Sequence, residues 1–74
     1  MKHKADIAIG CRCYLFLKRK FGSIGKASLC TGIAKNTIYG WKDGQAPGGY
    51  HLQKLVSFGA DPRWLLTGFR EVTK

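Results

Sequence analysis

The 74-residue sequence predicts an all-α fold, a compact bundle of about five short helices. Apolar residues recur three and four positions apart, as they do on one face of a helix, and Gly or Pro interrupts the chain roughly every ten residues. No segment alternates apolar and polar residues as a strand would. Because a chain this short makes one domain, we expect a flexible basic tail at residues 1–5, a domain at 6–68 and a C-terminal tail at 69–74.

The first two predicted helices are separated by a Gly-Ser pair. One apolar stripe on the first helix has the spacing i, i+3, i+4 and i+8: Cys13, Phe16, Leu17 and Phe21. Asp6 is an N-cap residue type and Gly22 a helix-ending one, so they bound this helix. Ser23 caps a second, short helix. Its apolar residues are Ile24, Ala27, Leu29 and Cys30.

The remaining helices are bounded by turn residues. A third helix is predicted from about Lys35 to Lys42, before the turn at Asp43-Gly44 and the Pro47-Gly48-Gly49 segment. A fourth follows and ends at Gly59, with the apolar residues Leu52, Leu55, Val56 and Phe58. Asp61 caps the fifth, Pro62 opens it and Gly68 ends it. The predicted core is Leu17, Phe21, Ala27, Ile33, Ile38, Trp41, Leu52, Leu55, Trp64 and Leu65.

Positive charge dominates the first half of the chain. The formal net charge is +9, and no acidic residue stands between Ile7 and Lys42. The cations in that stretch are Arg12, Lys18, Arg19, Lys20, Lys26, Lys35 and Lys42. A run of like charge is often only a solvated surface. In so small a chain, however, uncompensated cations repel one another, and a bound phosphate backbone relieves that repulsion. The charge therefore favours nucleic acid as the partner.

The cysteines favour a reducing compartment. Cys11, Cys13 and Cys30 cannot all pair within the chain, and charges interrupt every stretch of membrane-spanning length. We expect a cytoplasmic protein with no membrane contact. Cys11 and Cys13, with a histidine, could suggest zinc. Residues two apart on a helix point roughly 200° apart, however, so we expect no metal site and interpret the thiols as small buried apolar groups.

The segment from Ile24 to Asp43 is the most informative. Two helices of under ten residues meet at a turn centred on Gly32, where a positive φ penalises any β-carbon. Ile38 and Trp41 make the inner side of the second helix of this pair. Its outer side carries Lys35, Asn36, Thr37, Tyr39, Gly40 and Lys42. This pattern is typical of a helix-turn-helix, whose second helix lies in the DNA major groove.

The stretch from Phe21 to Gly68, about two-thirds of the chain, resembles the lambda-repressor-like helix-turn-helix domain, especially that of phage repressors. The matching pieces, in order, are Gly22-Ser23 before Lys26-Ala27, Gly32-Ile33, Thr37-Ile38-Tyr39-Gly40-Trp41, and Asp61-Pro62-Arg63-Trp64-Leu65-Leu66-Thr67-Gly68. The last matches the Asp-x-x-Trp-Leu-Leu-x-Gly stretch with which members of this group often end. Ala34 departs from the family, which commonly has Ser or Thr there, and its lack of a hydroxyl would pass the cap to Asn36 or Thr37.

Each candidate DNA contact has a more ordinary interpretation beside it. Lys35 and Asn36 open the groove-facing helix, where Lys can pair with guanine and Asn with adenine, or they are simply solvated. Tyr39 touches a phosphate or a thymine methyl, or is partly buried. Ser23 and Lys26 are phosphate contacts at a helix start. We expect Trp41 and Trp64 in the core and assign no role to His51. The cluster of Arg12, Lys18, Arg19 and Lys20 either steers DNA or is solvated.

These patterns predict a DNA-binding protein and not an enzyme. Four scattered acidic residues and two distant histidines offer no catalytic set, and no cofactor or small-molecule substrate is implied. The resemblance implies a sequence-specific double-stranded DNA-binding transcriptional regulator of phage or prophage type. Such a protein would act in the bacterial nucleoid as a homodimer on a palindromic operator. The alternative is an antitoxin- or anti-repressor-like protein-interaction module that uses the same fold without specific DNA readout.

Overall fold

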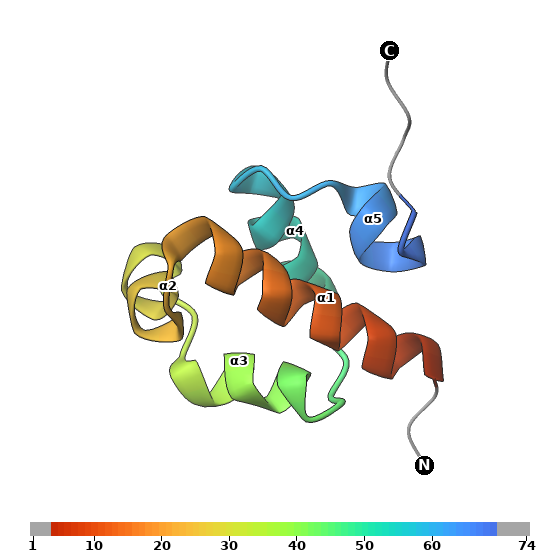
Figure 1. The fold of residues 1–74 in the computed structure, drawn as a ribbon, viewed down its shortest axis with the longest axis horizontal. Coiled ribbons are helices and arrows are strands. Elements are labelled where there is room, and N and C mark those ends of the chain that lie inside the picture. Colours follow the sequence, from red (N-terminus) through yellow and green to blue (C-terminus); the bar gives the residue numbers. More distant parts are fainter. Residues whose placement is uncertain (1–3, 70–74) are drawn as a thin grey trace.

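The computed structural model describes residues 4–69, apart from the side chains of Ala5 and Asp6, and this range contains five α-helices and no strand (Figure 1). In chain order they are α1 (Lys4–Phe21), α2 (Ile24–Thr31), α3 (Lys35–Lys42), α4 (Gly49–Ser57) and α5 (Pro62–Thr67). The all-α prediction is therefore confirmed. Residues 1–3 and 70–74, which make up most of the two predicted tails, lie outside the described residues.

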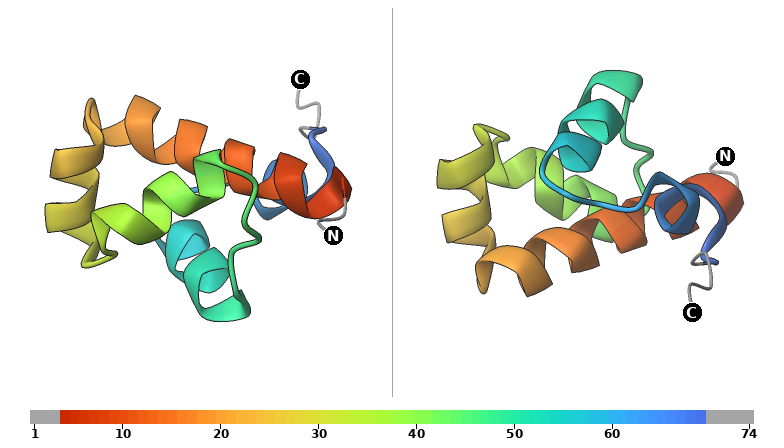
Figure 2. Two further views of the ribbon diagram at one scale, coloured as in Figure 1. Left: turned by 90° about the horizontal axis from the view of Figure 1, so that it is seen from below. Right: turned by 90° about the horizontal axis from the view of Figure 1, so that it is seen from above.

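The helices form a flat body of 34 × 33 × 19 Å around α1. α3 lies on one side of α1 and α5 on the other, and the two views of Figure 2 place them the same way. α2 lies across the C-terminal end of α1. α4 lies behind α1 in the view of Figure 1. A surface built on α3 therefore faces away from α5.

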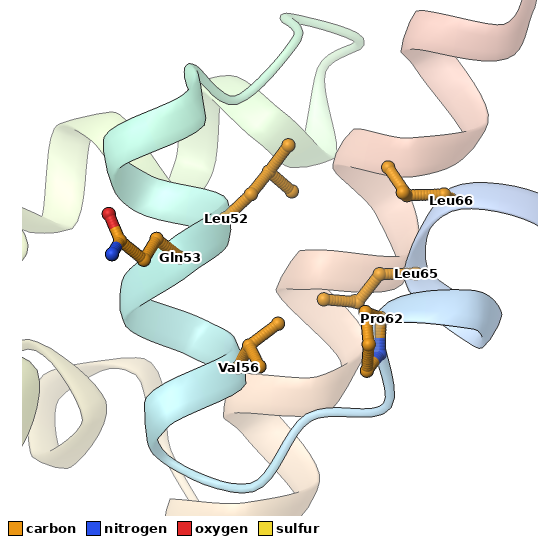
Figure 3. Close-up of a pocket in the computed structure, with 6 residues that line it drawn as sticks. All are labelled: Leu52, Gln53, Val56, Pro62, Leu65 and Leu66. Carbon is orange, nitrogen blue, oxygen red and sulfur yellow. The ribbon is translucent and has the colours of Figure 1, made fainter.

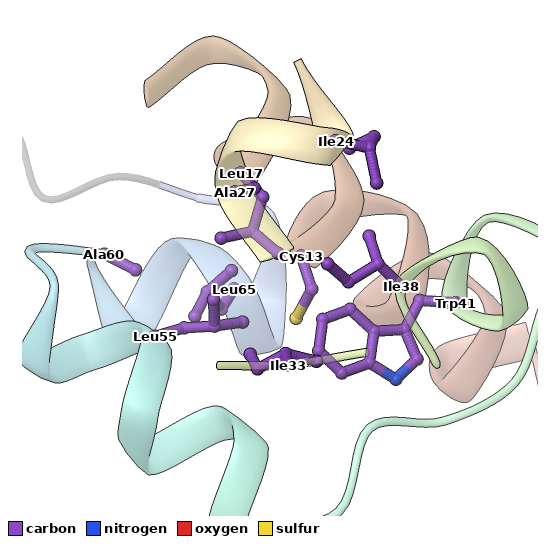
Figure 4. Close-up of a cluster of buried hydrophobic side chains, with 10 residues drawn as sticks. All are labelled: Cys13, Leu17, Ile24, Ala27, Ile33, Ile38, Trp41, Leu55, Ala60 and Leu65. Carbon is purple, nitrogen blue, oxygen red and sulfur yellow. The ribbon is translucent and has the colours of Figure 1, made fainter. Parts of the chain in front are cut away.

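The hydrophobic core takes buried residues from each of the helices α1 to α5 (Figure 4). Its buried residues are Cys13, Leu17, Ile24, Ala27, Ile33, Ile38, Trp41, Leu55, Ala60 and Leu65. Seven of the ten predicted core residues are in this set. The other three, Phe21, Leu52 and Trp64, are half-buried and pack against it. The helical spacing of apolar residues was thus a sound guide to the core.

Several of the predicted helix ends are present as hydrogen-bonded caps, among them those at Ser23, Asp61 and Gly32. The Lys26 amide donates to Ser23 Oγ at 3.1 Å, and the Arg63 amide donates to Asp61 Oδ1 at 3.0 Å. Gly32 ends α2 in the left-handed region at φ 78°, with its N–H bonded to the Ser28 carbonyl at 2.9 Å. Such caps satisfy backbone groups that the helix itself leaves without partners.

Four details of the sequence prediction are wrong. α1 begins at Lys4, two residues before the expected Asp6 cap, and α4 ends at Ser57, before Gly59. The cysteines were interpreted as small buried apolar groups, but Cys30 is exposed and Cys11 is only half-buried. Leu29, one of the apolar residues expected in α2, is 86% exposed. The buried face of α2 instead carries Ile24, Ala27 and Thr31. These recur at i, i+3 and i+7, so one helical face excludes the intervening leucine.

Candidate nucleic-acid interface

The corner between α2 and α3 is held by Thr31, a residue to which the sequence analysis assigned no role. Its side chain is buried; the hydroxyl donates to the Ala27 carbonyl at 2.7 Å and accepts from the Ile33 amide at 3.2 Å. One hydroxyl thus joins the last turn of α2 to the residue after Gly32. Because a buried polar group without partners destabilises a fold, this pair of bonds favours one geometry for the corner.

α3 begins at Lys35, as predicted, although Ala34 stands at the N-cap. Ala34 has extended backbone angles and no side-chain cap, while its carbonyl accepts from the amides of Thr37 at 3.0 Å and Ile38 at 3.2 Å. The expected transfer of the cap to Asn36 or Thr37 is wrong, because both residues lie inside the helix. Lys35 and Asn36 are therefore the first two residues of α3, as the sequence pattern predicted.

The two faces of α3 differ sharply in burial. Ile38 and Trp41 are 0% and 2% exposed, and they turn toward the core (Figure 4). On the remaining surface, Lys35, Asn36, Tyr39 and Lys42 are exposed, while Thr37 and Gly40 are half-buried. The structure therefore brings these six predicted site residues onto one helix with its apolar side against the core. His51 has a packing role that the sequence analysis missed, with its ring edge-on to Trp41 at 5.4 Å between centroids.

α1 contributes an aromatic side chain to this surface. The Tyr14 ring lies 6.3 Å from the Tyr39 ring, and Lys42 Nζ stands 5.7 Å from the Tyr14 centroid. An exposed cation–π contact of this kind contributes about 0.5–1 kcal/mol. Tyr39 and Lys42 are therefore restrained against α1 while remaining exposed. The sequence analysis assigned nothing to Tyr14, because no local pattern relates it to residues on α3.

Ser23 and Lys26 stand apart from the α3 residues. They lie at the start of α2, and α3 follows the opposite end of that helix. Since eight helical residues span about 12 Å, these two residues and Lys35 can only act at separate points of one extended ligand. Lys26 is exposed, and its amide bond to Ser23 keeps the helix start ordered.

Arg12 differs from Lys18, Arg19 and Lys20, which are all exposed in the last turn of α1. Arg12 is half-buried and its Nε donates to the Leu65 carbonyl at 2.9 Å, so it ties α1 to α5. Arg19 and Lys20 are exposed on the α5 side, where they line a hollow of about 230 Å³ with Phe16 and Trp64. The predicted cluster is therefore not a single surface, and Arg12 has a structural role.

The described surface is shallow. Besides that hollow, one of about 320 Å³ lies along α4, and an apolar one of about 210 Å³ lies between α4 and α5 (Figure 3). Two of these volumes are below the lower limit of roughly 300 Å³ for typical small-molecule sites, and the third barely exceeds it. Within residues 4–69 no three His, Cys, Asp or Glu side chains gather as a metal site would require. None of the helices there is long and apolar enough to span a membrane.

Comparisons with protein-family models, curated proteins and solved structures find no match for this chain. The resemblance to the lambda-repressor-like domain therefore stays a prediction, and any functional argument depends on the residues and geometry described above.

Proposed function

We propose that this protein is a sequence-specific double-stranded DNA-binding transcriptional regulator of phage or prophage repressor type. In this proposal α2 and α3 form a helix-turn-helix, and α3 enters the major groove with the end near Lys35 leading. The observation that carries it is the division of α3 into a fully buried apolar side and an exposed side of polar and cationic residues. A helix of 10–12 Å diameter fits a groove about 12 Å wide.

The exposed residues of α3 have separate roles in this proposal. Lys35 and Asn36 reach base edges, because the leading turn of a recognition helix penetrates deepest. Tyr39 and Lys42, which are restrained by Tyr14, contact the phosphates that border the groove. Thr37 and Gly40 are half-buried and line the contact. Ser23 and Lys26 bind a phosphate at the start of α2, about one α2 length from Lys35.

The excess of positive charge supports a polyanionic partner. The net charge is +9, and no acidic residue stands between Ile7 and Lys42. Release of counterions from DNA would supply much of the affinity and make it depend strongly on salt. We place the protein in the bacterial cytoplasm, associated with the nucleoid, and the proposed binding requires no cofactor.

Two copies would be needed for selectivity, because one α3 covers only a few base pairs. We propose a homodimer on a palindromic operator with half-sites roughly 34–36 Å apart. The apolar hollow between α4 and α5 supports pairing through the last helix (Figure 3). Val56 and Leu66 at its rim are 39% and 50% exposed. Leu66→Glu should remove cooperative binding to a palindrome in a gel-shift titration. If cooperativity is unchanged, the contact between the two copies is made by the tail from Phe69 or by another domain.

Alanine variants measured on a selected operator and on random duplex test the proposed function. Lys35→Ala and Asn36→Ala should each lose about 1–3 kcal/mol on the operator and relax the preference at particular base pairs. Lys26→Ala should weaken all sequences alike and reduce the slope of log K against log salt by about one unit. Arg63→Ala, which removes an exposed charge from α5 on the far side of α1, is the matched control. It should change neither the base preference nor the slope of log K against log salt.

Two outcomes would contradict the proposal. If Lys35→Ala and Asn36→Ala leave operator preference untouched while Lys26→Ala alters it, the docking is wrong. If the protein binds no duplex in a salt-dependent way, the antitoxin- or anti-repressor-like interaction module is the better assignment. The exposed Leu29 on α2 would then be the first place to seek a protein partner.

A further inference from the structure

The chain that leaves α3 folds back onto the helix. Gly44 takes a positive φ of 104°, and its amide donates to the Trp41 carbonyl at 3.1 Å. The Gln45 amide then donates to the Gly40 carbonyl at 2.9 Å. This pair of bonds is a Schellman motif, in which the second residue past the helix end usually makes an apolar contact with the helix residue five positions before it. Here those two residues are Gln45 and Gly40.

The side-chain amide of Gln45 occupies the space that a side chain at position 40 would fill. A β-carbon added to Gly40 would lie 2.6 Å from Gln45 Oε1 and 3.1 Å from its Cδ. The amide can lie against α3 only because position 40 is glycine. The backbone of Gln45 is also held from the other side, since its carbonyl oxygen would be 2.6 Å from a β-carbon at Gly10 of α1.

The Gln45 amide has hydrogen-bonding capacity that the fold does not use. The residue is exposed, and among residues 4–69 no group hydrogen-bonds to its side-chain amide. A Schellman motif is normally closed by an apolar pair, so an amide there adds little to stability. It does present an amide donor and an amide acceptor side by side next to Gly40 on α3.

We propose that Gln45 is a specificity-determining residue, which extends the base-reading surface of α3 by pairing with the N6 and N7 positions of an adenine. Glutamine and adenine form this bidentate pair in the major groove. Because it reads DNA, this role rests on the proposed function. Gly40 follows Asn36 by four residues, hence on the same helical face and about 6 Å further along the axis. Gln45 should therefore specify an adenine in a different base pair from the one that Asn36 contacts.

Two substitutions test this role from opposite sides of the contact. Gln45→Ala removes the amide, whereas Gly40→Ala keeps it but displaces it from α3 and also suits a helix better than glycine does. Both should reduce discrimination at the same base pair by about 5- to 150-fold, the equivalent of one bidentate pair. For Gln45→Ala, affinity for random duplex should stay unchanged. Gln53→Ala, at an exposed glutamine on α4, is the matched control and should leave discrimination unchanged.

The measurement is the affinity of each variant for the operator selected by the wild-type protein and for every single-base change in it. Circular dichroism and thermal melting verify the fold of each variant. Uniform weakening on all sequences by Gln45→Ala would identify a phosphate contact and overturn the proposal, as would unchanged discrimination. If Asn36→Ala shifts a base preference and Gln45→Ala does not, only the role of Gln45 fails. If the wild-type protein selects no sequence, the proposed function itself fails.

Discussion

Gly10 of α1 lies directly against the backbone at the end of α3. A β-carbon there would lie 2.6 Å from the Gln45 carbonyl oxygen, 2.7 Å from the Trp41 carbonyl oxygen and 3.3 Å from Trp41 Cα. All three are backbone atoms, which cannot move aside as the end of a flexible side chain can. An ordinary carbon–oxygen contact is about 3.4 Å. Gly10→Ala therefore requires α1 and the end of α3 to separate by roughly 0.8 Å.

Two opposing effects determine how much Gly10→Ala changes the free energy of unfolding. Alanine is better than glycine inside a helix by about 0.8–1 kcal/mol, whereas forcing an extra carbon into a packed site costs about 1–3 kcal/mol. We expect the steric effect to dominate, so that Gly10→Ala lowers the free energy of unfolding by about 1 kcal/mol. For a domain of this size that lowers Tm by roughly 4–8 °C.

Gly25→Ala is the matched control. This glycine is also helical, but its added β-carbon would meet only Ser23 Oγ at 4.0 Å. The variant should gain up to about 0.5–1 kcal/mol, since the helical preference acts alone. Both variants are compared with the wild type by thermal unfolding followed by circular dichroism. If Gly10→Ala raises Tm as much as Gly25→Ala does, the close crossing of α1 and α3 is refuted.

Three further outcomes are expected. Burial raises the pKa of Cys13 from 9.0 to about 12, although the nearby charge of Arg12 lowers it. The unfolded chain therefore loses the Cys13 proton at a lower pH than the folded protein does. The free energy of unfolding should fall between about pH 9 and 12, and it should fall less steeply in Cys13→Ala. A thiol reagent should modify exposed Cys30 fastest and buried Cys13 slowest in the native protein, and equal rates would contradict the burial. Trp41→Ala should lower the free energy of unfolding by about 3–5 kcal/mol in urea titrations, and a loss below 1 kcal/mol would place Trp41 outside the core.

Local chemistry explains which parts of the fold were predictable. The caps at Ser23 and Asp61 and the positive-φ glycine at position 32 are set by residues within a few positions of one another, and each was expected from the sequence. The bounds of α3 were also predicted, because Ile38 and Trp41 mark its buried side. The exposure of Leu29 follows from the helical spacing, which places it opposite the face formed by Ile24, Ala27 and Thr31. The error at Cys30 arose because a small apolar residue was assumed to be buried.

Contacts between distant positions were not predictable in the same way. Arg12 bonds to a carbonyl 53 residues away, and Gly10 meets the backbone of Trp41 and Gln45. Nothing in the composition or periodicity of α1 distinguishes these positions. The same reason explains why Tyr14 was overlooked beside α3. The candidate DNA contacts on α3 were named from the sequence; four of the six are exposed and Thr37 and Gly40 are half-buried, and their binding role stays a prediction.

Selection of bound duplexes from a random double-stranded library tests the central claim most directly. The intact protein is incubated with the library at a salt concentration that suppresses non-specific binding, and the retained duplexes are sequenced over several rounds. The account predicts enrichment of one palindromic sequence whose half-sites are centred about 10–10.5 base pairs apart. Recovery of duplexes with no shared sequence would contradict specific readout by α3.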